Sequence, residues 1–143
     1  MYDILTKDKN YNWSDAWLLL AVIYAGQAGE ATLEKIIAAG DAINHAVFNP
    51  DELESGFARL IAGGYVKEKN RIFSVTGKVM RAYLKTTSAR RAIHKELKDI
   101  EELLEAASPA SKQPLPNNLK YAGLSAEAYT EAVNKYIEGV GKS

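Results

Sequence analysis

Few side chains in this sequence are arranged for catalysis or metal binding. The 143-residue chain has no cysteine, which excludes a disulfide scaffold, a thiolate metal site and a cysteine nucleophile. His45 and His94 stand alone, because neither has a second histidine three or four residues away. The adjacent carboxylates at 51–52 and 101–102 would point about 100° apart on a helix, so neither pair converges on a substrate. We therefore predict a protein that is not an enzyme and that uses no metal and no cofactor.

Basic side chains remain as candidates for binding a ligand. The chain has 18 basic and 18 acidic residues, but residues 67–98 carry ten basic and two acidic ones, a balance of +8. Residues 1–66 carry four basic and nine acidic side chains (−5), and residues 99–143 carry four and seven (−3). Such a chain can present a local positive field to a polyanion without any net charge. The other interpretation is a solvated face that pairs with the acidic N-terminal part.

The elements that would position these charges centre on residues 49–84. Residues 49–52 have the asparagine, proline and glutamate of a capped helix start, and apolar residues recur after them at helical spacing. The glycines at 63–64 predict a left-handed helix end. Residues 65–66 and 72–75 are of types that favour strands, and they flank a polar turn at residues 69–71, which predicts a short hairpin. Thr76 is predicted to cap the next helix.

Two helices are predicted before this stretch, after a polar arm at residues 1–12. Ser14 is predicted to cap a helix whose residues 16–25 are apolar on every face, so that other elements pack against it. That run is about half of the roughly 20 residues that a membrane span needs, and we predict neither a membrane span nor a targeting segment. Thr32 is predicted to cap an amphipathic second helix, in which Gly40 favours a close crossing over a break.

The run from Leu60 to Thr76, LIAGGYVKEKNRIFSVT, follows two helices with helix-turn-helix spacing. It resembles the pattern of bacterial winged helix-turn-helix proteins such as the PadR-like and MarR-like transcription regulators. The resemblance covers about half to two thirds of the chain. It implies a mainly α domain at residues 13–87, in which a small β-hairpin forms the wing. A C-terminal helical extension follows this domain. It also implies a dimer, and DNA contacts from the helix that starts at Asn49 and from the wing.

We therefore predict a cytoplasmic transcriptional regulator that contacts the phosphates of double-stranded DNA mainly through the wing and the following helix. The residues expected to make these contacts are Ser55, Arg59, Lys67, Lys69, Arg71 and Lys78. An alternative is a winged-helix protein-interaction module without DNA binding. The acidic residues Asp51, Glu52 and Glu54 at the start of the would-be recognition helix favour it, because they would face phosphates. A third interpretation is a small-molecule sensor whose ligand lies among the tyrosines and tryptophans at the dimer seam.

The rest of the chain is predicted to form a flanking helix, a linker and a terminal helix. The flanking helix, 88–107, has a narrow apolar seam that packs either on the chain's own core or on a second subunit. We expect the second arrangement, a homodimer built by residues 88–107 and 119–138. Three of the four prolines fall in residues 108–118, which predicts a linker. Within residues 119–143, Ser125 is predicted to cap a helix with an apolar-aromatic stripe.

Overall fold

The computed structural model describes residues 11–27, 29–86, 93–106 and 125–141. Its fold is mainly helical with one small antiparallel sheet, which confirms the expected α-rich fold with a β-hairpin. Most of the polar arm and the whole of the proline-rich linker lie outside the described residues. The elements follow one another as α2 (Trp13–Gln27), β1 (Ala31–Thr32), α3 (Leu33–Asn44), α4 (Pro50–Ala62), β2 (Val66–Lys69), β3 (Ile72–Val75), α5 (Gly77–Thr86), α6 (Ile93–Ala106) and α7 (Ala126–Gly141).

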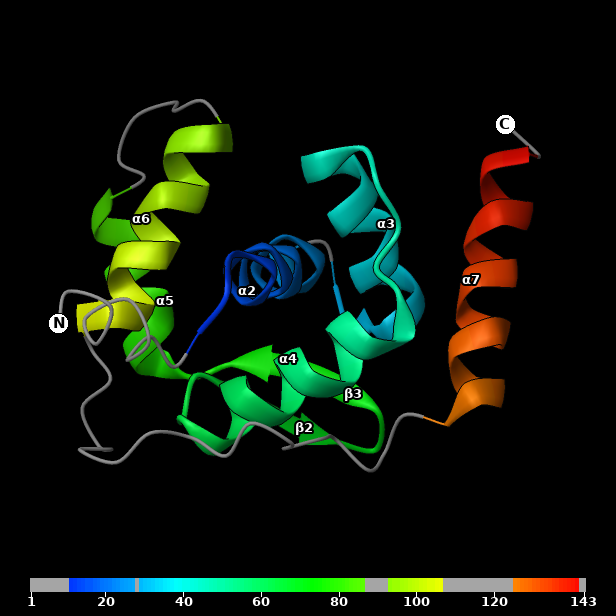
Figure 1. Ribbon diagram of the computed structural model, residues 1–143, viewed down its shortest axis with the longest axis horizontal. Coiled ribbons are helices and arrows are strands. Elements are labelled where there is room, and N and C mark those ends of the chain that lie inside the picture. The colour runs from blue at the N-terminus through cyan, green and yellow to red at the C-terminus, as the bar shows by residue number, and fades with distance from the viewer. Residues whose placement is uncertain (1–10, 28, 87–92, 107–124, 142–143) are drawn as a thin grey trace, which may run out of the picture.

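Helix α2 lies at the centre of the molecule, with α5 and α6 on one side of it and α3 on the other (Figure 1). Residues 16–23 are all buried, and α2 packs against α3, α4, α6 and β3. A helix that is apolar on every face must be surrounded to remove its side chains from water. The prediction that the other elements pack against this helix is confirmed.

The start of α2 differs from the prediction. The helix begins at Trp13, so Ser14 lies inside it and Asn12 precedes it. The Asp15 carboxylate accepts a hydrogen bond from the Asn12 amide at 2.9 Å, and the Asn12 carbonyl accepts one from the Asp15 amide at 3.0 Å. This reciprocal pair satisfies backbone groups at the helix start, as a capping box does, and it moves the start two residues towards the N-terminus.

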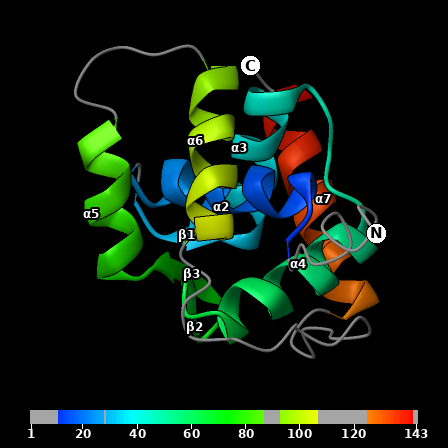
Figure 2. The same cartoon turned by 60° about the vertical axis from the view of Figure 1, so that its left-hand side comes forward.

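The sheet has three strands in the order β1-β3-β2. The β2–β3 hairpin was expected, whereas β1 is a two-residue strand between α2 and α3 that was not (Figure 2). Ala31 pairs with Phe73 and Thr32 pairs with Ile72. Thr32 also caps α3 as predicted, because its hydroxyl oxygen accepts a hydrogen bond from the Lys35 amide. Strand β3 of the hairpin is therefore hydrogen-bonded to β1, which leads directly into α3.

Gly40 lies inside α3 without breaking it, and Phe48, two residues before α4, packs tightly against it. A Cβ at Gly40 would come within 2.3 Å of the Phe48 ring. The Trp17 ring stacks on the same Phe48 ring, with centroids 3.8 Å apart, and the Trp17 indole N–H donates to the Gly40 carbonyl at 2.9 Å. This contact joins α2, α3 and the start of α4.

Helix α4 has the start and the end that its sequence predicts. The Asn49 side chain accepts a hydrogen bond from the Glu52 amide at 2.7 Å, and the Glu52 carboxylate accepts one from the Asn49 amide at 2.9 Å. At the other end Gly64 has a φ of +83°. The Tyr65 amide donates to the Leu60 carbonyl at 2.9 Å, as in a Schellman motif. The chain therefore turns directly from α4 into the hairpin.

Helices α5 and α6 follow the hairpin. Thr76 precedes α5, and its carbonyl accepts a hydrogen bond from the Met80 amide. Its buried hydroxyl has no hydrogen-bond partner among the described residues, so the predicted side-chain cap is not formed. In α6 the seam residues Leu97, Ile100 and Leu104 are buried, and the helix packs on α2. The seam therefore packs on the chain's own core. This is the first of the two arrangements that the sequence left open, and the expected homodimer stays a prediction.

Candidate nucleic-acid interface

The hairpin ends in a two-residue turn that holds Arg71 at its tip. Lys69 and Ile72 are paired across the hairpin, and between them Asn70 and Arg71 have φ values of 54° and 66°. Positive φ at both central residues is the geometry of a type I′ turn, which matches the twist of the strands. The Glu68 carboxylate accepts a hydrogen bond from the Arg71 amide at 2.9 Å. The turn is thus fixed by its own backbone and by one side chain.

The two faces of the hairpin differ in polarity. Val66 and Phe73 are buried on one face, and the Phe73 ring stacks on Phe57 of α4 with centroids 4.2 Å apart. On the other face Lys67 lies opposite Ser74, and both are exposed. Since side chains alternate along a strand, the buried face fixes the direction of the charged one.

Lys67, Lys69 and Arg71 are brought together by this hairpin, and all three are exposed. Lys67 and Lys69 border a shallow hollow of ≈ 570 Å³ on the outer face of the strands. These three residues were among those predicted to contact DNA; Lys67 and Lys69 share this hollow with Glu68, and Arg71 stands at the turn of the same hairpin. We call the three residues the hairpin surface.

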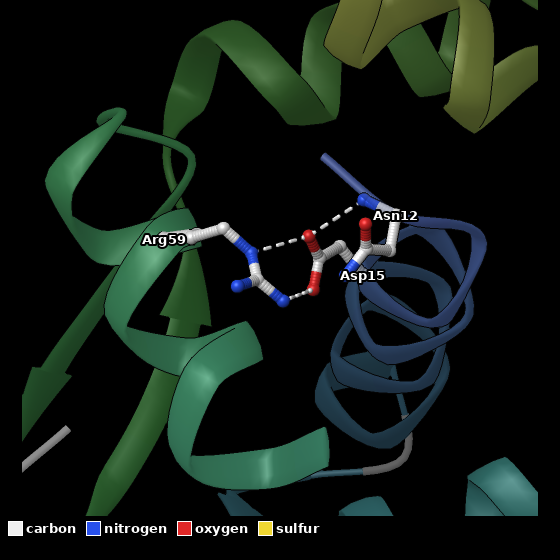
Figure 3. A network of polar contacts seen from close by, with 3 residues as sticks. All are labelled: Asn12, Asp15 and Arg59. Carbon is white, nitrogen blue, oxygen red and sulfur yellow. Dashed lines mark hydrogen bonds and ion pairs between the residues drawn. The ribbon is translucent and has the colours of Figure 1, made fainter. Parts of the chain in front are cut away.

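Arg59 does not belong to this surface. Its Nε donates to one carboxylate oxygen of Asp15 at 2.7 Å and its terminal nitrogen donates to the other at 2.9 Å (Figure 3). The Asp15 side chain has no exposed area, and that of Arg59 is 12% exposed. The hydrogen bonds with Asp15 raise the pKa of Arg59. Arg59 therefore points from α4 towards α2, and its guanidinium is occupied by an internal ion pair rather than free for a phosphate.

The remaining predicted contact residues are dispersed. Ser55 is half-buried on α4. Lys78 lies in the first turn of α5, and its side chain is outside the described part of the structure. Arg81, which was not selected from the sequence, is exposed one turn later on α5. Its place in the basic stretch 67–98 was the available signal.

The outer surface of α4 is acidic. Arg59 is the only basic residue of this helix, and it is paired with Asp15. Asp51 is exposed and Glu54 is half-buried, while Glu52 is used in the capping box. Carboxylates at these positions would repel phosphates. Helix α4 is therefore a poor element for entering a DNA groove.

A second buried polar cluster joins α2, α5 and α6. Glu96 is 9% exposed and accepts a hydrogen bond from the Tyr24 hydroxyl. Burial is the main reason that the pKa of Tyr24 is raised, and it also raises the pKa of Tyr83, which lies beside Glu96. The described residues contain no group of three or more histidine, aspartate or glutamate side chains that could hold a metal ion. This cluster holds helices together.

Comparisons with known proteins found no match for this chain. No protein-family model, no curated protein and no solved structure matches it. Among the described helices, none combines the length and apolar character needed to cross a membrane.

Proposed function

We propose that this chain is a winged helix-turn-helix protein that binds double-stranded DNA and regulates transcription. The order helix, strand, two helices and hairpin, with the sheet order β1-β3-β2, is consistent with this fold. In the proposal α3 and α4 are the helix-turn-helix and β2–β3 is the wing. The observation that carries it is the hairpin surface, three exposed cations on a hairpin anchored to the core.

The proposed contacts are made to phosphates and not to base edges. Lys67, Lys69 and Arg71 can neutralise phosphates, and such contacts position a protein on a duplex without reading its sequence. Arg81 on α5 is a further exposed cation that follows the hairpin. Because α4 is acidic and Arg59 is paired internally, we do not assign base readout to α4.

A second candidate function is a winged-helix module that binds a protein instead of DNA. It is favoured by the acidic outer surface of α4, where Asp51 is exposed. Such a module would bind a partner with a basic surface, since opposite charges steer association. The two functions use different surfaces of the chain, so substitutions can separate them.

The test is fluorescence anisotropy with random and own-promoter duplex DNA over a salt series. We compare the wild type with Lys69→Ala/Arg71→Ala, and with Lys95→Ala/Lys98→Ala, which removes two exposed cations of α6 instead. Binding through the hairpin surface predicts that the first variant loses about one to two units of the log-log salt slope and the control loses none.

Three other results are informative. An equal loss in both double variants would mean general charge attraction, and would contradict the hairpin surface as the site. No wild-type binding at low salt would contradict DNA binding altogether. Binding of a basic partner that weakens in Asp51→Asn would then support the interaction module.

A further inference from the structure

Helix α7 is attached to the rest of the molecule by a thin interface. Of its side chains with a described exposure, only Ala132 is fully buried, and Ile137 is 56% exposed. Tyr129, Val133 and Tyr136 are half-buried against the core. The helix packs mainly against α3, at the edge of the molecule (Figure 1). Few buried apolar contacts give a segment a low free energy of local opening. Helix α7 is therefore held mainly through one side, by its contact with α3.

Two tyrosine hydroxyls anchor α7. The Tyr129 hydroxyl donates to the Phe48 carbonyl at 2.6 Å. The Tyr136 hydroxyl donates to the Asp41 carboxylate, which is the main reason that the pKa of Tyr136 is raised. Both bonds join α7 to residues of other elements, so removing them should make detachment of α7 easier.

The position of α7 brings the helix and one of its carboxylates, Glu131, next to the hairpin turn. Helix α7, the start of α3 and the turn together line a groove of ≈ 320 Å³. Arg71 of the turn lines this groove with Glu34 of α3 and with Glu131 and Lys135 of α7. A phosphate backbone approaching Arg71 from this side would meet the helix itself, and a groove lined by two carboxylates and one ammonium group.

We propose that α7 is a detachable cover that occupies the flank of the hairpin turn and lowers the affinity of the hairpin surface for a polyanion. This inference rests on the proposed function. If only the molecule with α7 detached binds fully, the apparent affinity is the intrinsic affinity multiplied by the detached fraction. Thermodynamic linkage then requires that bound DNA increases the detachment of α7.

The experiment uses the full chain with Tyr129→Phe/Tyr136→Phe, which removes both anchoring hydrogen bonds without changing any charge. We expect duplex DNA affinity to rise about fivefold to tenfold in the anisotropy assay. Amide hydrogen exchange in α7 should become faster in the variant, and faster in the wild type when duplex DNA is added. Tyr24→Phe is the matched control, because it removes a tyrosine–carboxylate bond between α2 and α6 and leaves α7 in place.

A second pair of variants tests the charge contribution. Glu131→Gln removes a carboxylate from the groove beside Arg71, whereas Glu138→Gln removes one from the same helix outside that groove. The proposal expects a larger gain in DNA affinity for Glu131→Gln than for Glu138→Gln.

The outcomes separate this inference from the proposed function. If the wild type binds DNA, and the tyrosine variant and Glu131→Gln bind it with the same affinity as the wild type, the proposed role of α7 is overturned and the proposed function is not. Slower exchange of α7 on DNA addition would also overturn the role of α7. If neither the wild type nor any variant binds DNA at low salt, both proposals fall together.

Discussion

Asp15 is a fully buried carboxylate in a helix that is otherwise apolar where it is covered. Its oxygens are shared between Arg59 and the Asn12 amide (Figure 3). Burying a charge is unfavourable unless it is paired and hydrogen-bonded, and here both conditions are met. The ion pair consequently holds α4 against α2. The Arg59 guanidinium is then not available to bind a ligand at the surface.

We predict that Asp15→Asn lowers the free energy of unfolding by about 3 kcal/mol, because it leaves the Arg59 cation buried without its partner. Urea denaturation measures this. Glu102→Gln, the same acid-to-amide change at an exposed position of α6, should change the free energy of unfolding by less than about 0.5 kcal/mol. Equal values for the two variants would show that the pair contributes little.

Arg71 combines an exposed charge with a backbone conformation that favours glycine. Its φ is 66°, at the second central position of the turn. We predict that Arg71→Gly raises the free energy of unfolding by about 1 kcal/mol, because the left-handed conformation no longer costs steric energy. The same variant should bind duplex DNA more weakly if the proposed function holds. Thermal unfolding and anisotropy on one sample measure both effects, and a destabilised Arg71→Gly would contradict the turn geometry.

At the scale of elements, the crossing of α2, α3 and the start of α4 depends on the absence of a side chain at Gly40. A Cβ there would come within 2.3 Å of the Phe48 ring, whereas a Cβ at Gly26 of α2 would meet nothing within 4 Å. We predict that Gly40→Ala lowers the free energy of unfolding by about 1–3 kcal/mol through overpacking, despite its better helix propensity. Gly26→Ala should leave it unchanged or raise it slightly. A stabilising Gly40→Ala, measured by urea denaturation, would contradict the packing.

Helix α4 shows that a well-formed element need not have the function its type suggests. Its capping box and its glycine stop are formed by groups within the helix and next to it. Its buried face packs on the core through residues such as Leu53 and Phe57. The outer face is acidic, so the proposed DNA contacts move from the helix to the hairpin beside it.

At the scale of the whole molecule, tyrosines connect the separate helices and make the free energy of unfolding decrease at alkaline pH. All six tyrosines within the described residues have a pKa raised above the ordinary value of 10.0. Burial is the first cause for five of them, and the bond to Asp41 is the first cause for Tyr136. The six are Tyr11, Tyr24, Tyr65, Tyr83, Tyr129 and Tyr136.

These raised pKa values favour the folded state only while tyrosine is neutral in the unfolded chain. The contribution is fully present below about pH 10 and is lost as the pH rises above it, because the unfolded chain then releases protons that the folded chain retains. We predict that the midpoint of thermal unfolding is nearly constant from about pH 7 to pH 9 and falls from about pH 10 upward. Tyrosinate absorbance should appear together with the loss of helical circular dichroism. Full ionisation of the folded protein near pH 10 would contradict this.

The sequence alone determined the local features of this protein. The central role of α2, the capping box and glycine stop of α4, the Thr32 and Ser125 caps and the hairpin follow from residues a few positions apart. Such features depend on backbone groups and side chains that are neighbours along the chain. They can therefore be predicted without knowing how the elements pack.

Only the tertiary structure decided how these elements use their side chains. Arg59 and Asp15 are 44 residues apart, and Tyr129 is 81 residues from the carbonyl it binds. The two-residue strand β1 exists only because β3 lies beside it. The seam of α6 is buried because this helix packs against α2. An arginine on a helix has the same sequence pattern whether it faces solvent or a buried carboxylate. The choice between these depends on which helix packs against it, and local periodicity does not contain that information.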